Sequence, residues 1–94
     1  MKEDNTMKIK DEIKYFEEFD EPILVPVGKE TERLRNAIVL SNAGGALIRM
    51  MIQGDHTQEE LVEYLVSEFD VEPERARNDV HVFLNELEKY QIFV

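Results

Sequence analysis

The sequence predicts an α+β, winged-helix-like domain in which three N-terminal β-strands are followed by three α-helices. Three short runs rich in aromatic and β-branched residues, separated by turn-forming residues, occupy residues 13–41. From residue 42 onward, apolar residues recur at helical spacing in three successive segments. The 94 residues, 43% of them hydrophobic, are enough for one modest core, so a single domain is expected over 13–94.

The composition and the N-terminal residues limit where in the cell the protein is expected. Residues 1–12, MKEDNTMKIKDE, are almost all charged or polar, which predicts a flexible lead-in without the apolar stretch of a signal peptide. Arg49 interrupts the best apolar run, so no membrane-spanning segment is expected. Because the chain has no cysteine, it offers neither a disulfide framework nor a zinc-thiolate site, and a cytoplasmic location is the simplest expectation.

The first two runs predict a β-hairpin. They are IKYFEEF (Ile13–Phe19) and PILVPV (Pro22–Val27), with Asp20 and Glu21 in the turn. Pro22 and Pro26 have no backbone N–H to donate, so the second strand is expected at a sheet edge or paired only through its middle. A polar loop, Gly28–Leu34, then leads to a third strand.

Each of the three predicted helices has a start signal. Asn42 is the N-cap candidate of the first helix, which ends with Gly54 in the C′ position. Thr57 and Glu60 form a T-x-x-E capping box at the start of the second helix. The third helix opens at Pro73, and its apolar stripe consists of Ala76, Val80, Phe83, Leu84 and Leu87. The last residues, QIFV, are expected to pack back onto the domain.

Two glycines stand in the first turn of the first helix, in SNAGGALIRMM. Glycine destabilises a helix interior by about 1 kcal/mol, but this is partly relaxed where the first N–H groups are unpaired anyway. We interpret Gly44 and Gly45 as a site of close packing of the helix start against the backbone of a strand or helix. A phosphate-binding turn is not favoured, because neither a Lys-Ser/Thr pair nor a third spaced glycine is present.

The order and spacing of a set of residues in the helical part of the sequence resemble those of a known family. The residues concerned are Asn42, Gly45, Ala46, Ile48, Gly54, Thr57, Glu59, Glu60, Leu61, Phe69, Asp70, Val71, Pro73, Glu74, Asp79, Val80, Phe83, Leu84 and Leu87. In this order and spacing, residues 41–93 resemble the PqqD-like family, small modules that recognise the precursors of ribosomally made, modified peptides. Ser41 and Arg49 stand where that family often has a leucine and an aromatic residue.

The resemblance implies a protein that is not an enzyme, and we expect no cofactor or metal. It implies that the leader of a precursor peptide adds as a further strand, in a groove between the third strand and the third helix. The module then presents the peptide to a modifying enzyme, often a radical SAM enzyme, in pyrroloquinoline quinone synthesis or another pathway. The peptide-binding positions would be Arg35, Asn36, Ala37, Ile38, Val39, Leu40, Asp79, Val82, Phe83 and Glu86.

The residues themselves are compatible with such a groove but leave alternatives open. The third predicted strand, Arg35–Ser41, is apolar on both faces between Asn36 and Leu40 and carries no Lys or Pro that would block an edge. It could equally be a central strand covered on both faces. On the last helix, Val82 and Phe83 widen the apolar arc, which fits either a groove or deeper packing.

A small basic island, Lys29, Arg33 and Arg35, precedes the third strand in a chain of net charge -10. Our hypothesis is that these residues meet acidic residues of a leader peptide and improve its association rate and register. The alternative is a solvated loop whose basic residues pair with Glu30 and Glu32.

Rival classes are less well supported. A winged-helix DNA-binding regulator needs a basic recognition helix, but the last helix carries more acidic than basic residues and the whole chain repels phosphate, so no nucleic-acid partner is expected. His56 and His81 share no metal-ligand spacing, and no nucleophile motif is present. An accessory module that binds only a protein partner through its helices remains the other alternative.

Overall fold

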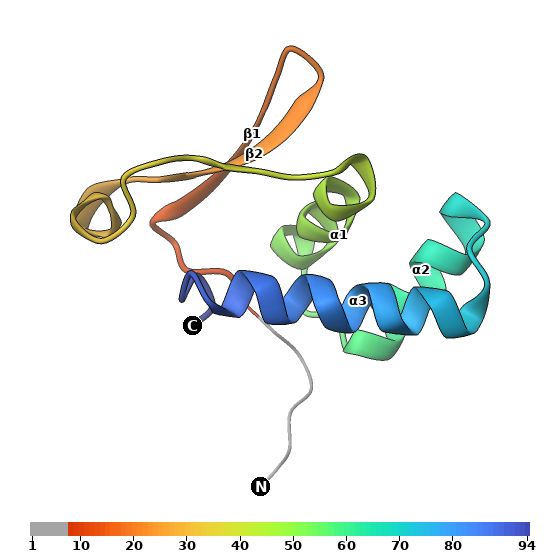
Figure 1. The fold of residues 1–94 in the computed structure, drawn as a ribbon. Helices are drawn as coiled ribbons and strands as arrows, with labels where there is room; N and C mark the ends of the chain where they lie inside the picture. Colours follow the sequence, from red (N-terminus) through yellow and green to blue (C-terminus); the bar gives the residue numbers. More distant parts are fainter. Residues whose placement is uncertain (1–7) are drawn as a thin grey trace, which may run out of the picture.

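The computed structural model describes residues 8–94 (Figure 1). Its elements follow in the order β1 (Ile13–Glu18), β2 (Glu21–Pro26), the 3-10 helix η1 (Gly28–Glu32), β3 (Ile38–Val39), α1 (Asn42–Gln53), α2 (Gln58–Phe69) and α3 (Pro73–Glu88). The predicted α+β order of three strands followed by three helices is confirmed. No helix in this part of the chain is long and apolar enough to span a membrane.

The sheet is antiparallel, with the strand order β1-β2-β3. β1 and β2 form the predicted hairpin, but its turn residues are Phe19 and Asp20, one position earlier than expected. Their φ angles of 52° and 66° are both positive, as in a type I′ turn, whose twist matches that of a hairpin. Figure 1 shows the hairpin projecting away from the helices.

The two prolines of β2 direct their backbone groups at only one of the two neighbouring strands. Because the pair Glu18↔Glu21 closes the two-residue turn, alternate residues of β2 direct their backbone groups at β1, starting with Glu21. Pro22 and Pro26 belong to the other set, so their missing N–H groups leave the β1–β2 ladder intact. β2 is therefore the central strand, and the predicted edge position is wrong.

On the β3 side the prolines shorten the sheet. They flank Leu24 and cannot donate to the strand beside them, so β2 and β3 pair only as Ile23↔Val39 and Leu24↔Ile38. The alternative prediction, pairing confined to the middle of β2, is correct for this side. The predicted third strand, Arg35–Ser41, is reduced to Ile38–Val39 for the same reason.

The two end predictions for α1 are wrong. The N-cap is Ser41 rather than Asn42, because the Ser41 Oγ accepts a hydrogen bond from the Gly44 N–H at 3.0 Å and Asn42 is already helical. Gly54 is the C-cap, and its backbone is extended (φ −178°) instead of left-handed. The predicted starts of the later helices are confirmed: Thr57 and Glu60 form the capping box of α2, and Pro73 opens α3.

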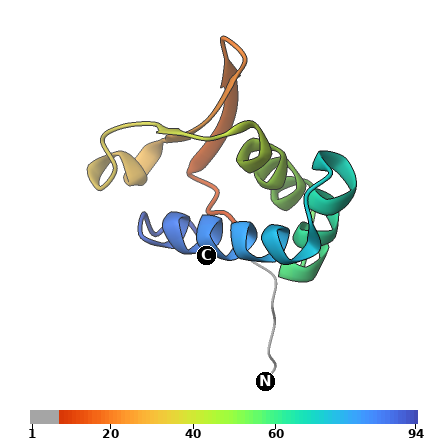
Figure 2. The ribbon, with the colours of Figure 1, turned by 45° about the vertical axis from the view of Figure 1, so that its right-hand side comes forward.

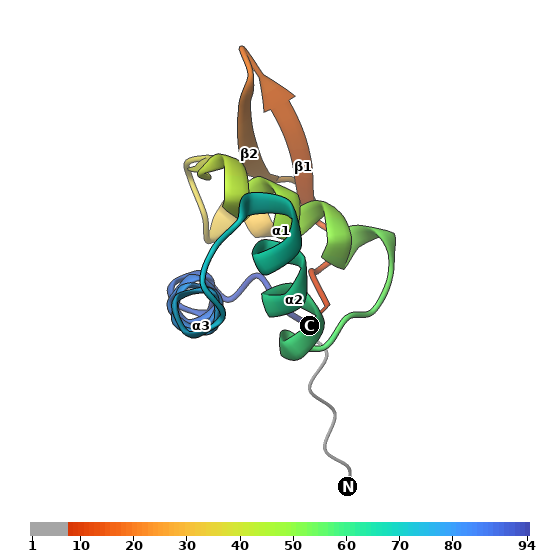
Figure 3. The same ribbon diagram turned by 90° about the vertical axis from the view of Figure 1, so that its right-hand side faces the viewer.

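The core lies where the sheet, α1, α2 and α3 meet (Figure 3). Its most completely buried large side chains are Leu24, Leu47, Ile48, Leu61, Val80 and Ile92. Ile92 belongs to the predicted QIFV segment, which does pack back onto the domain. From α3 the residues Ala76, Val80, Leu84 and Leu87 are buried, as the stripe predicts, whereas Phe83 is only half-buried.

Part of the expected lead-in belongs to the fold. Ile9 is buried and bridges to Phe93, and the Lys10 N–H donates to the Ile92 carbonyl at 2.9 Å. The folded region therefore begins before residue 13. The sequence did not indicate this earlier start, because a single buried isoleucine among charged residues gives too weak a periodic signal to detect. The rest of the predicted lead-in, residues 1–7, lies outside the described residues.

Candidate functional site

β3 pairs with β2 on one side only, so within residues 8–94 its other side is an unpaired sheet edge. The Leu40 N–H donates to the Pro22 carbonyl at 2.9 Å, and Ile38 faces Leu24, so Ile38 and Leu40 direct their backbone groups at β2. Since these groups alternate along a strand, the N–H and C=O of Val39 point away from the sheet. The alternative of a central third strand is therefore wrong.

A first hollow of about 440 Å³ lies along this edge, and we call it the edge hollow. It is lined by Arg33, Leu34, Arg35, Asn36, Ala37, Ile38, Val39 and Tyr90. The side chain of Val39 is 62% exposed there, while Ile38 packs partly against the core. The edge hollow therefore combines free main-chain groups with an apolar side chain and arginine cations.

A second hollow, the helix hollow, lies between the start of α1, the end of α2 and the middle of α3. Its volume is about 380 Å³, and it is lined by Ser41, Ala43, Gly44, Leu47, Leu65, Val71, Asp79, Val82, Phe83 and Glu86. Most of these side chains are apolar, and Val82 is 48% exposed. The hollow can accept an apolar side chain, with the carboxylates of Asp79 and Glu86 beside it.

Gly44 and Gly45 allow the first turn of α1 to lie close to α3 and β2. A methyl group on Gly44 would stand 2.8 Å from a ring carbon of Phe83, and one on Gly45 would stand 2.6 Å from Pro22 Cβ. The close packing predicted at these glycines is confirmed, but the prediction that they pack against backbone is wrong. The neighbours are side chains of α3 and β2, so α1 meets both the helix and the sheet at its first turn.

The two hollows adjoin one another along α3. Residues 33–39 lie opposite Tyr90, and residues 41–44, which follow directly, lie opposite residues 79–86. Phe83, Glu86 and Tyr90 are three and four residues apart, which places them on one side of the helix and the turn after it. Figures 1 and 2 show the yellow-green segment that contains β3 running alongside α3. We call the two hollows together the β3–α3 groove.

The groove gathers most of the residues predicted from the sequence. Arg35, Asn36, Ala37, Ile38 and Val39 line the edge hollow, and Asp79, Val82, Phe83 and Glu86 line the helix hollow. Leu40 does not line either hollow, because its side chain points into the core and is 8% exposed. Tyr90 was not predicted, although its position seven residues after Phe83 is a detectable signal.

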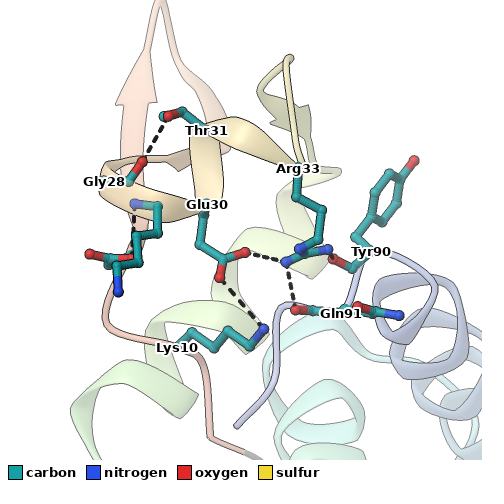
Figure 4. A network of polar contacts seen from close by, with 9 residues as sticks. Lys10, Gly28, Glu30, Thr31, Arg33, Tyr90 and Gln91 are labelled. Carbon is teal, nitrogen blue, oxygen red and sulfur yellow. Dashed lines mark hydrogen bonds and ion pairs between the residues drawn. The ribbon is translucent and has the colours of Figure 1, made fainter.

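The structure separates the members of the basic island. Arg35 lines the edge hollow, whereas Lys29 lines neither hollow. Arg33 borders the edge hollow, but its guanidinium pairs with Glu30 and donates to the carbonyls of Tyr90 and Gln91, the latter at 2.9 Å (Figure 4). For Arg33 the alternative prediction, pairing with Glu30, is confirmed. The hydrogen bond from Arg33 lowers the pKa of Glu30 below its ordinary value.

The surface of α3 is not a basic stripe. Its two arginines and the lysine at its C-cap are each paired with a carboxylate, as Arg75–Asp79 at 3.6 Å, Arg77–Glu59 at 2.6 Å and Lys89–Glu86 at 3.2 Å. These pairs leave little free positive charge for phosphate groups. The helix therefore lacks the surface that a DNA-recognition helix needs.

The two histidines have separate local partners. His56 Nδ1 lies 3.3 Å from Glu60 Oε1, and His81 Nε2 lies 3.1 Å from the Asn85 side-chain amide. Within residues 8–94, no group of three or more potential ligand residues is arranged to hold a metal ion. The sheet edge at β3 and the groove beside it are features of this part of the chain that can meet another molecule.

Comparison with known families identifies the group of proteins to which this fold belongs. The profile of the family described as "Coenzyme PQQ synthesis protein D (PqqD)" matches residues 23–92, a range that includes β3, both hollows and all three helices. The chain belongs to the PqqD family. A comparison with curated proteins found no match.

Two solved structures share the PqqD fold of this chain. One is described as "TbiB1 in Complex with the TbiA(beta) Leader Peptide" and is 22% identical, with a TM-score of 0.76 over 93% of this chain and 94% of that chain. The other is the solution NMR structure of the PqqD truncation of Methylobacterium extorquens PqqCD, described as a stand-alone recognition element for ribosomally synthesised and post-translationally modified peptides. It is 12% identical, with a TM-score of 0.75 over 95% of this chain and 88% of that chain. At these identities the likeness establishes the fold.

Proposed function

We propose that this PqqD-family protein recognises the leader of a ribosomally made precursor peptide and presents it to a modifying enzyme. The observation that carries the proposal is the unpaired outer edge of β3 beside the β3–α3 groove. Two further findings support it. A structure with the same fold is described as a complex with a leader peptide, and another as a peptide recognition element.

Strand addition follows from the direction of the backbone groups. An incoming peptide in extended conformation forms main-chain hydrogen bonds with the outward N–H and C=O of Val39, and its alternate side chains then face α3. Main-chain bonds give affinity without sequence preference. Selectivity therefore comes from the side chains that enter the two hollows.

The charges around the groove favour a particular peptide. An apolar residue fits the helix hollow beside Val82 and Phe83, where burial of its side chain contributes about 1.5–3 kcal/mol. An acidic residue fits the edge hollow beside Arg35. The carboxylates of Asp79 and Glu86 repel acidic peptide residues at the other end of the groove. The different charges at the two ends therefore set the register of the peptide.

The protein acts in this proposal by binding and not by catalysis. The chemistry is supplied by a cytoplasmic partner enzyme that modifies the captured precursor, and a radical SAM enzyme is one such partner. The pathway is pyrroloquinoline quinone synthesis or that of another modified peptide.

Calorimetric titration tests the proposal. The full chain is titrated with synthetic leader segments from small open reading frames encoded beside its gene, and with a scrambled peptide of the same composition. We expect saturable one-to-one binding of one leader and no binding of its scrambled form. If a folded sample binds no neighbouring leader but binds the adjacent enzyme, the protein is a partner-only accessory module and the proposal is wrong.

A further inference from the structure

Arg33 connects two parts of the chain that form opposite walls of the edge hollow. It precedes β3 by a few residues, and both Arg33 and Tyr90 line the hollow. The guanidinium donates from Nη1 to the Tyr90 carbonyl and from Nη2 to the Gln91 carbonyl at 2.9 Å. Figure 4 shows this side chain reaching across to the turn that follows α3.

The carbonyls that Arg33 contacts lie in the turn that follows α3. The carbonyls of Glu86, Leu87 and Glu88 accept hydrogen bonds from the N–H groups of Lys89, Tyr90 and Gln91. The next carbonyls along the chain, those of Tyr90 and Gln91, accept from Arg33. A planar guanidinium with several N–H donors is suited to contact two carbonyls at once.

Glu30 and Lys10 hold Arg33 in this orientation. The Glu30 carboxylate pairs with Arg33 Nη2 and also lies 3.6 Å from Lys10 Nζ, with its side chain 15% exposed. Glu30 belongs to η1, whereas Lys10 donates its own N–H to the Ile92 carbonyl. The three charged groups therefore link η1, the N-terminal segment and the end of α3 in one cluster, which we call the Arg33 cluster.

We propose that Arg33 is a positioning residue of the β3–α3 groove: the Arg33 cluster fixes the end of α3 relative to the segment that enters β3, so that the edge hollow has its binding width before a peptide arrives. The inference rests on the proposed function. Arg33 then contributes to affinity by preorganising the groove, because a peptide that binds a preformed site orders fewer groups on binding. Its guanidinium is already engaged and does not contact an acidic residue of the peptide.

Direct contact and positioning predict opposite effects for Glu30→Gln. If Arg33 met an acidic peptide residue, removal of the competing Glu30 carboxylate would free the guanidinium and tighten binding. In the positioning role the same substitution loosens Arg33 and weakens binding by about threefold to tenfold. Glu32→Gln is the matched control, since it removes an equal charge from the same 3-10 helix, and it leaves affinity unchanged. Binding of Glu30→Gln as tight as that of the wild type, or tighter, would overturn the inference.

Hydrogen exchange gives a readout that does not need a peptide. We expect Arg33→Ala to accelerate exchange of the amides between Leu87 and Gln91 while those of the α1–α2 core keep their protection, because the hydrogen bonds of Arg33 lie at the end of α3 and proteins open in local units. Added leader peptide restores protection at the end of α3. Unchanged exchange in Arg33→Ala overturns the positioning role even if the wild type binds peptide. Absence of binding by the wild type, with the exchange effect present, overturns the proposed function instead.

Discussion

Phe83 lies so close to Gly44 that a methyl group on Gly44 would stand 2.8 Å from ring atom Cε1. The contact joins the first turn of α1 to α3 at the wall of the helix hollow. The position of the phenyl ring, and with it the shape of the hollow, therefore depends on the absence of a side chain at residue 44.

Gly44→Ala is expected to displace Phe83 without unfolding the domain. The atoms in contact are at the far end of the half-buried Phe83 side chain, which borders the hollow, and alanine favours the helix over glycine by up to about 1 kcal/mol. The unfolding free energy should therefore change by less than about 1 kcal/mol. Affinity for the leader should fall because the displaced ring narrows the helix hollow. Urea unfolding and calorimetric titration of the same sample measure the two effects, and an unchanged affinity would show that Phe83 does not shape the binding site.

Gly45→Ala is expected to destabilise the fold itself. A methyl group there would meet Cβ and Cγ of Pro22 at 2.6 and 2.7 Å, and this rigid ring belongs to the central strand. Overpacking of this kind costs about 1–3 kcal/mol. Gly54→Ala is the control, since no neighbouring atom lies within 4 Å of its added methyl group. Equal urea midpoints for the two variants would contradict the packing argument.

Val39→Pro is expected to weaken peptide binding while preserving the sheet. The substitution removes an N–H that points away from β2, and proline is tolerated on the free side of an edge strand. Loss of one main-chain hydrogen bond corresponds to about 1 kcal/mol, or roughly fivefold in affinity. Val39→Thr keeps the N–H and should bind almost as the wild type does.

Ile38→Pro provides the structural contrast for that experiment. Ile38 faces Leu24 and directs its N–H at β2, so this variant should lose unfolding free energy as well as affinity. Thermal unfolding by circular dichroism separates the two cases. Undiminished peptide binding by a folded Val39→Pro protein would exclude strand addition at this edge.

Arg35→Glu is expected to weaken binding of an acidic leader by about threefold to tenfold at low ionic strength, with a smaller effect at high salt. Arg35 lines the edge hollow, whereas Lys29 lines neither hollow, so Lys29→Glu makes the same change in net charge outside the groove. Titrations at several salt concentrations should show a reduced salt dependence for Arg35→Glu alone. Equal effects of the two reversals would indicate attraction by the overall charge rather than a contact.

The stability contributed by Glu30 should decline in acid. The hydrogen bond from Arg33 lowers the pKa of Glu30 from 4.5, so the folded state favours the ionised carboxylate. A depressed pKa in the folded state contributes stability above the unfolded value, and that contribution is lost as the pH falls through the folded value. The wild type should therefore be more stable than Glu30→Gln at neutral pH, and the difference should shrink below pH 4.5. A constant difference across a pH series of urea titrations would contradict the assignment.

Local signals predicted the helices and much of the groove. The capping box of Thr57 and Glu60 and the proline at the start of α3 act within one helical turn, so they can be recognised without knowledge of the fold. The groove residues on α3 followed from helical periodicity together with the family resemblance. The N-cap was misplaced because Ser41 and Asn42 are adjacent and both side chains suit that position.

Features that depend on distant partners could not be predicted in the same way. The length of β3 is limited by prolines in β2, and the sequence does not reveal which neighbour those prolines face. Ile9 is buried because it meets Phe93 at the other end of the chain. Arg33 lies 57 residues from Tyr90, so no local pattern indicates that it contacts the end of α3.

The two-residue length of β3 also affects how copies of the protein behave toward one another. An open sheet edge invites pairing with any extended chain, and long edges of this kind promote aggregation. At β3 a second copy finds only a short run of free main chain, which offers few hydrogen bonds. A ligand that fills both hollows gains side-chain contacts as well. By shortening the strand, Pro22 and Pro26 reduce the tendency of this open edge to pair with another copy of the protein.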